Sequence, residues 1–311
     1  MKWKVMISAP YMQPVVDKFR PFFKENDIEI IVPPVRERME EADLLKYIVD
    51  VDGVICGDDR FSAKVLEQAP KLKVIAKWGT GIDSIDRERA EELGIAVYNT
   101  PNAFTEPVAD SVFSFMLSFA RKIPWSTQAI KQGVWEKLPG FTLSEATLGI
   151  VGVGNIGKAI ARRAAGFGMK VIGNDIQEVD VDIKMVSFEE LLAEADIVTI
   201  NCDLNPTSFH LIGEKEFAKM KSSAYIINTA RGPIIDEKAL VRALESGTIA
   251  GAGLDVFEDE PLPQDSPLKK MDNCLFSAHN ANSSPVAWSH VHQNTINNLL
   301  KGLSEGRKVK V

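Results

Sequence analysis

Three residues in the second half of the chain could together bind a carboxylate and move a proton. Arg231 follows the apolar run YIINT, Glu260 lies shortly after GLDV, and His279 follows CLFSA. An Arg binds a carboxylate through paired hydrogen bonds, a His exchanges a proton near neutral pH, and a carboxylate beside the His stabilises the imidazolium. Reversible hydride transfer to a carbonyl group next to a carboxylate requires such a set. From their positions alone, these three residues could instead be a helix cap, a surface acid and a loop histidine.

The second chemical motif is a glycine-rich turn, Gly152-Val-Gly154-Asn-Ile-Gly157, between a predicted strand and a predicted helix. In dinucleotide-binding proteins the first glycine allows a tight turn, the second lets a pyrophosphate approach the backbone, and the third lets the helix pack on the strand. Asp175 ends the next predicted strand, where a carboxylate accepts hydrogen bonds from ribose hydroxyls and repels a 2′-phosphate. The motif predicts NAD rather than NADP as the cofactor; a glycine turn with a solvated acid is the alternative.

The elements that must position these groups are short β-branched runs alternating with helix-length amphipathic segments. This alternation is typical of parallel sheets with crossover helices, so the predicted class is α/β. Because open α/β sheets bind ligands at the C-terminal ends of their strands, the groups named above should converge there. The predicted strands are 3–9, 28–32, 53–57, 72–77 and 95–99 in a first series, then 147–153, 170–174, 196–201, 224–229, 250–256 and 274–278 in a second.

Helices are predicted where amphipathic segments carry start signals. A long helix over Thr105–Arg121 opens with a Thr cap and has a Pro in its first turn. Other helices are predicted at 40–49, at 62–68, from Asn155 onward, and over Pro285–Leu303.

Composition and charge exclude several classes of protein. Lys and Arg number 36 against 43 Asp and Glu, with a pI near 5.3 and no long basic run, so no nucleic-acid partner is expected. No membrane association is expected, because the longest apolar stretch, Val108–Ala120, is interrupted by Asp110 and is too short to span a bilayer. The start of the chain lacks a signal-peptide pattern, and three widely spaced cysteines favour a cytoplasmic location. His290 and His292 lack the spacing of a metal pair, so no metal is expected.

Several of these segments carry a resemblance to one family. NTARGPIID (228–236), GLDVFEDEP (253–261), SAH (277–279), the GVGNIG turn and KWGTGIDSID (77–86) resemble the signature segments of the D-isomer-specific 2-hydroxyacid dehydrogenases. The similarity covers nearly the whole chain. Within that family, the segment Phe119–Asp175 is most similar to phosphoglycerate dehydrogenases.

The resemblance implies two doubly wound parallel-sheet domains and a reversible, NAD-dependent oxidoreductase acting on the CH–OH group of a small 2-hydroxyacid. A Rossmann NAD-binding domain, residues 100–283, would be inserted into a flavodoxin-like substrate (catalytic) domain formed by residues 1–99 and 284–311. The partners would be the 2-hydroxyacid or 2-oxoacid and a second copy of the chain, because members usually form homodimers through the nucleotide domain and the helix at Thr105–Arg121.

The resemblance also assigns roles to single residues. Arg231 would bind and polarise the oxoacid, His279 would be the general acid and base, and Glu260 would hold His279. The backbone of Gly79, Thr80 and Gly81 would contact the substrate carboxylate. Besides Gly152, Gly154, Gly157 and Asp175, the implied cofactor contacts are Asn155, Ile156, Thr80, Cys202, Thr229 and Asp255.

The chain departs from the family pattern near the expected site. Ser277-Ala278 stands where Thr-Pro is usual, and Gly57 stands where phosphoglycerate dehydrogenases tend to carry a phosphate-binding Arg. Lys77 and Arg60 could replace that Arg as anion contacts, so 3-phosphoglycerate stays a candidate substrate; solvated surface charges are the alternative. A non-catalytic NAD(H)-sensing protein of the corepressor type is the alternative function. A formate-dehydrogenase-like activity is disfavoured, because that branch resembles a Gln–His pair and Glu260 is a carboxylate.

Overall fold

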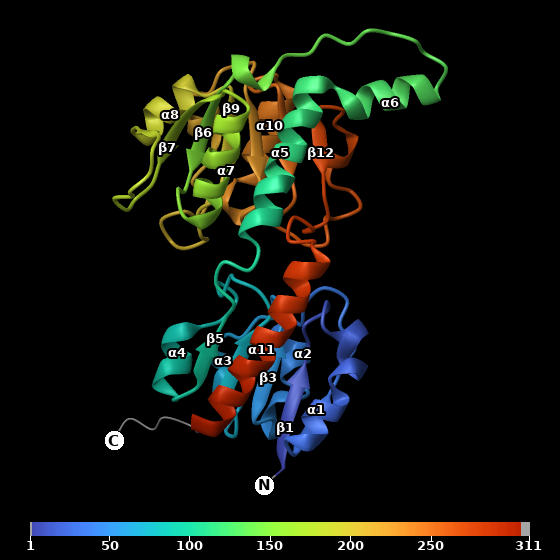
Figure 1. The fold of residues 1–311 in the computed structure, drawn as a ribbon, viewed down its shortest axis with the longest axis vertical. Helices are drawn as coiled ribbons and strands as arrows, with labels where there is room; N and C mark the ends of the chain where they lie inside the picture. Colours follow the sequence, from blue (N-terminus) through green and yellow to red (C-terminus); the bar gives the residue numbers. More distant parts are fainter. Residues whose placement is uncertain (1, 306–311) are drawn as a thin grey trace. The chain divides into compact units, whose positions relative to one another are not determined.

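The computed structural model describes residues 2–305 and divides the chain into two compact units, each built on one parallel β-sheet (Figure 1). Unit 1 comprises Met1–Phe104 and Ser284–Val311, and unit 2 comprises Thr105–Ser283. Within the described residues, no helix combines the length and the apolar character needed to cross a membrane.

The sheet of unit 1 has the strand order β2-β1-β3-β4-β5, which is the order of flavodoxin-like sheets. The chain places β2 on one side of β1 and then β3 on the other, so the topological switch point lies between β1 and β3. Strands β3 and β4 are buried along their whole length, which is why they read as continuous apolar runs. The strands are β1 (Trp3–Ile7), β2 (Ile28–Ile31), β3 (Gly53–Cys56), β4 (Val74–Lys77) and β5 (Ala96–Tyr98).

The last helix of the chain, α11 (Pro285–Glu305), returns to complete unit 1. A Cβ at Gly53 would lie 2.8 Å from Leu299 Cδ1, and a Cβ at Gly302 would lie 2.3 Å from Val74 Cγ2. Glycine at both positions therefore lets α11 lie directly on β3 and β4 (Figure 1). The other helices of unit 1 are α1 (Arg20–Glu25), α2 (Glu41–Leu44), α3 (Ala63–Glu67) and α4 (Arg87–Glu92).

One predicted helix of unit 1 was wrong in its extent. The segment 40–49 forms only the one-turn α2, followed by a 3-10 turn over Ile48–Asp50. Neither piece has a side-chain cap, and so short a helix gains few backbone hydrogen bonds.

The sheet of unit 2 has the order β12-β11-β10-β9-β6-β7-β8, with its switch point between β6 and β9. The prediction of six strands was wrong by one. The additional strand, β8 (Lys184–Met185), has two exposed residues and pairs with β7, so no apolar run marks it in the sequence. The others are β6 (Thr147–Val151), β7 (Lys170–Asn174), β9 (Ile197–Ile200), β10 (Tyr225–Asn228), β11 (Gly251–Leu254) and β12 (Cys274–Phe276).

Helices pack on both faces of the unit 2 sheet and form a core on each. Phe113 and Ile160 belong to the core under α5 and α7, whereas Leu191, Phe217 and Leu240 belong to the core under α8, α9 and α10. The predicted helix over Thr105–Arg121 and the doubly wound parallel α/β class are confirmed. The helices are α5 (Thr105–Arg121), α6 (Ile123–Lys131), α7 (Asn155–Gly166), α8 (Phe188–Glu194), α9 (Glu214–Phe217) and α10 (Glu237–Glu245).

A buried carboxylate lies at the switch point of unit 1. Asp59 follows β3 and has no exposed surface; it accepts hydrogen bonds from Ser8 Oγ, after β1, and from the backbone N–H of Met39 at 2.7 Å. Burial nevertheless raises the pKa of Asp59 to about 6. Asp59 thus connects three loop segments, and the free energy that its burial costs depends on pH.

Replacing Asp59 should change how stability depends on pH. Because folding raises the pKa of Asp59, its contribution to stability is full below pH 3.8 and is lost as the pH rises through about 6. In Asp59→Asn this loss is absent, and Ser8 can donate to the carbonyl oxygen of Ile55 at 3.4 Å. Between pH 4 and pH 8, urea denaturation should show the wild type losing up to about 3 kcal/mol relative to the variant. Parallel pH dependences of the two proteins would contradict this.

Candidate active site

The glycine turn lies at the switch point of the unit 2 sheet. Gly152 follows β6 with a φ of +87°, and a Cβ there would lie 2.6 Å from the backbone nitrogen of Cys202, which follows β9. A Cβ at Gly157, in the first turn of α7, would lie 2.3 Å from the carbonyl oxygen of Gly152. Backbone atoms therefore occupy the space that a side chain would need at both positions.

Gly154 has the opposite surroundings. It is exposed, it is the N-cap residue of α7, and a Cβ there would meet nothing within 4 Å. Asn155 and Ile156 form the first turn of α7 beside it. The start of a helix presents N–H groups without intrahelical partners and the positive end of the helix dipole. A turn of this shape could hold the pyrophosphate of a dinucleotide.

The other predicted cofactor residues of unit 2 lie at the ends of strands. Asp175 accepts hydrogen bonds from the N–H of Val153 at 2.7 Å and of Gln177 at 2.9 Å, so it braces the glycine turn. Each carboxylate oxygen has a further lone pair, so ribose hydroxyls could still bind. Thr229, after β10, is buried, and its Oγ1 has no hydrogen-bond partner among the described residues. An open turn, an acceptor and an unsatisfied hydroxyl together fit a bound dinucleotide.

His279 and Glu260 are in direct contact although they are far apart in the sequence. His279 Nδ1 lies 2.9 Å from Glu260 Oε2, and the two side chains are only 21% and 16% exposed. Glu260 Oε1 accepts the backbone N–H of Phe257 at 3.0 Å, which orients the carboxylate. A carboxylate at Nδ1 makes this nitrogen the protonated one and stabilises the imidazolium.

Asp255 anchors the segment that carries His279. Its carbonyl oxygen accepts the N–H of His279 at 2.7 Å, and its two carboxylate oxygens accept the N–H groups of Asn280 at 2.8 Å and Ala281 at 3.0 Å. His279 has a φ of +48°, a conformation that a residue with a Cβ adopts only when its surroundings enforce it. Asp255, for which the resemblance implies a cofactor contact, anchors this segment in the structure, a role that the sequence did not indicate.

Arg231 follows β10 in a segment shaped by Asn228. The Asn228 side chain accepts the N–H of Ala230 at 3.0 Å and donates to the carbonyl oxygen of Arg231 at 2.9 Å. A Cβ on Gly232 would lie 1.9 Å from the carbonyl carbon and oxygen of Phe257, so this segment lies against the loop that carries Glu260. Asn228 was missed as a positioning residue, although an Asn that precedes a loop is a known signal for such turns.

The predicted substrate residues of unit 1 follow β4. Gly79 has a φ of +123°, which favours glycine, and Thr80 Oγ1 donates to the carbonyl oxygen of Thr100 at 3.0 Å. Asn99 Nδ2 donates to the carbonyl oxygen of Thr80 at 2.6 Å. These bonds give the Gly79–Gly81 loop one defined shape within unit 1.

Lys77 is not a solvated surface charge. It is 3% exposed, and its Nζ donates to Asp58 Oδ1 at 2.8 Å. Arg60 lines a pocket of unit 1 together with Glu40, Glu41, Asp83 and Asp86. Both cations that could have bound an anionic group thus lie beside carboxylates.

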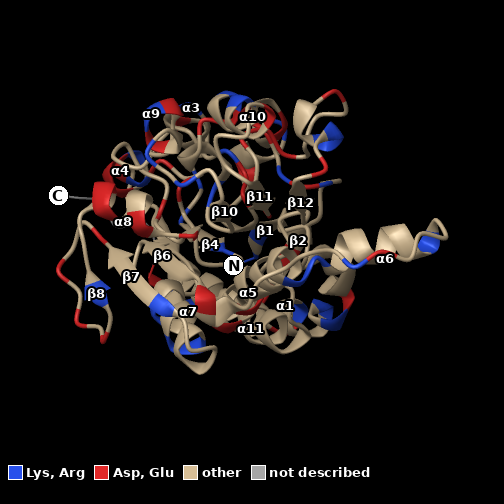
Figure 2. Cartoon of the chain, turned by 90° about the horizontal axis from the view of Figure 1, so that it is seen from above, with Lys and Arg blue, Asp and Glu red and all other residues tan. Residues whose placement is uncertain are grey.

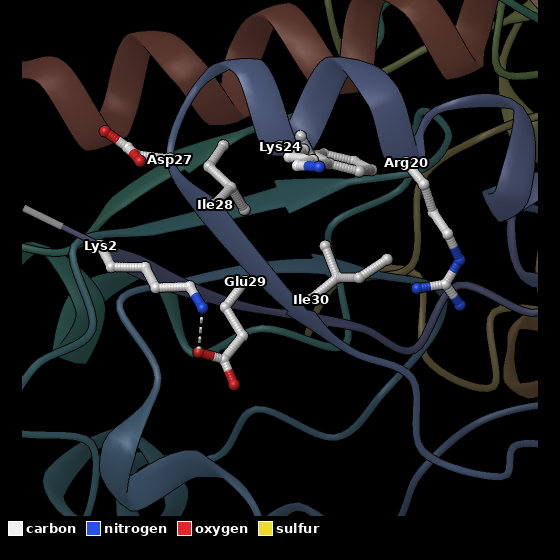
Figure 3. Close-up of a pocket in the computed structure, with 8 residues that line it drawn as sticks. Lys2, Arg20, Lys24, Asp27, Ile28, Glu29 and Ile30 are labelled. Atoms are coloured by element: carbon white, nitrogen blue, oxygen red, sulfur yellow. Dashed lines mark ion pairs between the residues drawn. The ribbon is translucent and has the colours of Figure 1, made fainter.

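Another pocket of unit 1 lies at the edge of its sheet, and neither Lys77 nor Arg60 is among the residues that line it. Residues of α1 and β2 line it, and Lys2 pairs there with Glu29 at 3.0 Å (Figure 3). Arg20, on its rim, forms an ion pair with Asp17. Among residues 2–305, no group of three or more His, Cys, Asp or Glu residues could hold a metal ion.

Comparison with known proteins identifies the family. The family model described as "D-isomer specific 2-hydroxyacid dehydrogenase, NAD binding domain" matches residues 113–281. The chain belongs to this family, and it is an NAD-dependent oxidoreductase that acts on CH–OH groups.

Individual relatives cover nearly the whole chain. A glyoxylate reductase of Korarchaeum cryptofilum is 35% identical over 96% of this chain and 92% of its own length. A D-3-phosphoglycerate dehydrogenase of Methanocaldococcus jannaschii is 38% identical over 91% of this chain, but over only 54% of its own length. A D-lactate dehydrogenase of Aquifex aeolicus, solved with NAD and lactic acid, superimposes with a TM-score of 0.84 at 25% identity over 99% of each chain.

Two substitutions in the glycine turn should separate folding from cofactor binding. Gly154→Ala should leave Tm within about 2 °C, because the new methyl group meets no protein atom, yet it should weaken NADH binding tenfold or more by obstructing the pyrophosphate. Gly157→Ala should lower Tm by several degrees, because its Cβ would overlap the Gly152 carbonyl oxygen. Differential scanning fluorimetry and NADH titration would measure both effects; equal NADH affinity in Gly154→Ala and wild type would refute the placement of the pyrophosphate.

Proposed function

We propose that this dehydrogenase interconverts a small, unphosphorylated 2-oxoacid, of the size of glyoxylate or hydroxypyruvate, and the corresponding D-2-hydroxyacid. Arg231, Glu260 and His279 are its catalytic residues in this proposal. The observation that carries it is the contact of His279 Nδ1 with Glu260 Oε2 in a loop region that also contains the Arg231 segment.

The contacts of these residues suggest a division of labour. Glu260 keeps the proton of His279 on Nδ1, so Nε2 is the nitrogen that exchanges a proton with the substrate oxygen. The imidazolium donates that proton during reduction, and the neutral imidazole removes it during oxidation. Arg231 binds the substrate carboxylate and polarises the carbonyl group, since a guanidinium forms paired hydrogen bonds with a carboxylate.

NAD would be held by unit 2 in this proposal. The turn at Gly152, Gly154 and Gly157, with the helix start at Asn155 and Ile156, would bind the pyrophosphate, and Asp175 would bind the adenosine ribose. The bound nicotinamide supplies or accepts the hydride. Cys202, Thr229 and Asp255 complete the proposed set of contacts in unit 2.

The case for an unphosphorylated substrate rests on charge in unit 1. A Cβ at Gly57 would lie 2.8 Å from Pro10 Cδ, so this position has neither a cation nor room for one. Lys77 is buried against Asp58, and the Arg60 pocket is lined by four carboxylates. Releasing Lys77 to bind a phosphate would leave the Asp58 carboxylate without this partner, and the carboxylates of the Arg60 pocket would repel a phosphate. The relatives named glyoxylate reductase point the same way.

A homodimer in the cytoplasm is part of the proposal. No residue of α6 is buried, Ile123 and Ile130 are more than half exposed, and Lys131 is the only charged residue of the helix (Figure 2). A second copy of the chain would remove this apolar surface from water. The free thiols of Cys56, Cys202 and Cys274 suit a reducing compartment.

The proposed substrate class can be tested by NADH oxidation with a panel of oxoacids. Glyoxylate or hydroxypyruvate should give a kcat/KM at least tenfold above that of phosphohydroxypyruvate, with NADPH a poorer reductant than NADH. A preference for phosphohydroxypyruvate would overturn the substrate assignment. Tight NADH binding without turnover of any oxoacid would instead favour a sensing role.

The catalytic assignment has its own test. His279→Gln should lower kcat about a hundred- to ten-thousandfold with NADH affinity unchanged, because proton transfer by a positioned side chain contributes that much. Glu260→Gln should move the basic limb of the pH profile of kcat/KM for reduction to lower pH by about one to two units, because the imidazolium loses a neighbouring charge. His290→Gln, at an exposed position of α11, is the matched control. Wild-type rates in His279→Gln would end the assignment.

A further inference from the structure

Two glutamates outside the proposed catalytic set bind each other's backbone beside that set. Glu258 Oε1 accepts the N–H of Glu237 at 3.1 Å, and Glu237 Oε2 accepts the N–H of Glu258 at 3.3 Å. Glu237 begins α10, whereas Glu258 lies in the loop after β11, two residues before Glu260. The reciprocal pair therefore connects the segment that contains Arg231 with the loop that carries Glu260.

A histidine from a third segment joins the same pair. His210 Nε2 lies 2.7 Å from Glu258 Oε1, and the backbone N–H of His210 donates to the carbonyl oxygen of Pro233 at 2.8 Å. His210 therefore contacts both connected segments. Three loops of unit 2, at 208–212, 231–237 and 256–260, meet at the Glu258 carboxylate.

Stability alone is a poor reason for this arrangement. Glu237 is half-buried, and burial raises its pKa; the hydrogen bond from the Glu258 N–H opposes this rise, and the negative charges of Glu258 and Asp259 add to it. Carboxylates placed close together in a partly buried site repel each other, so the pair costs free energy that apolar or neutral residues would not. Arrangements that cost free energy of folding in this way are expected at functional sites.

The neighbouring contacts show what the pair controls. The Gly232 segment lies directly against the backbone of Phe257, and the N–H of Phe257 orients the Glu260 carboxylate. A shift of the loop at Glu258 would thus move Glu260 relative to His279 and Arg231 together. Misplacement of a catalytic group by about 1 Å can cost a hundredfold in rate.

We propose that Glu237 is a positioning residue, which acts through Glu258 to hold Glu260 against His279 and to keep the Arg231 segment in register with them. This inference rests on the catalytic roles proposed above. Glu237 contacts neither substrate nor cofactor in it.

The test compares three variants of one helix. Glu237→Ala should lower kcat about tenfold, leave the Kd for NADH within twofold, and move the basic limb of the kcat/KM profile for reduction to lower pH, in the same direction as Glu260→Gln. Glu237→Gln should recover at least half of the wild-type kcat, because its amide oxygen still accepts the N–H of Glu258. Glu245→Ala, at the exposed end of α10, should match the wild type.

A second variant keeps the test decisive if Glu237→Ala does not fold. Glu258→Ala removes the reciprocal hydrogen bond, from the Glu237 N–H, together with the His210 contact, and should produce the same shift of the pH profile. If folded Glu237→Ala and Glu258→Ala lower Tm without shifting the pH profile, or if neither protein folds, the pair is structural and the proposal is overturned. If Glu260→Gln itself leaves the profile unchanged, the catalytic assignment fails instead, which distinguishes the two failures.

Discussion

The proposed catalytic centre depends on the three hydrogen bonds that Asp255 accepts. This residue is 1% exposed, and it binds the N–H groups of His279, Asn280 and Ala281 in succession. A buried carboxylate needs such donors, and a histidine at a φ of +48° needs surroundings that enforce it. The same hydrogen bonds meet both requirements, so they hold His279 in one orientation. The contact of its Nδ1 with Glu260 follows from that orientation.

Close approaches of the backbone give the open sheet of unit 2 its binding geometry. At Gly152, Gly157 and Gly232, an added Cβ would overlap atoms of the facing main chain. The first two bring the turn after β6 against the start of α7 and the end of β9, where the sheet reverses its strand order. The third brings the Arg231 segment against the Glu260 loop. Glycine serves in each case as the residue that leaves space for neighbouring backbone.

The charged groups at the strand ends of unit 1 have partners within the unit. Asp59 accepts hydrogen bonds from Ser8 and Met39, and Lys77 donates one to Asp58. Asp59 and Lys77 are buried and already have hydrogen-bond partners, so they have little capacity left for a strongly charged ligand. A small oxoacid needs only its carboxylate and one oxygen to be recognised. The distribution of buried charge thus supports a small substrate.

The sequence by itself determined the α/β class, most strands, the helix over Thr105–Arg121 and the glycine turn. These features depend on local patterns: strands buried on both faces read as apolar runs, and a turn with little space for a side chain requires glycine. The tertiary structure alone decided which side chains meet. The Glu260–His279 contact, the three bonds of Asp255, the burial of Lys77 and the Glu237–Glu258 pair join residues from different loops. Which residues meet depends on the order of the strands in each sheet and on how closely the loops pack. The spacing of residues along the sequence does not encode either of these.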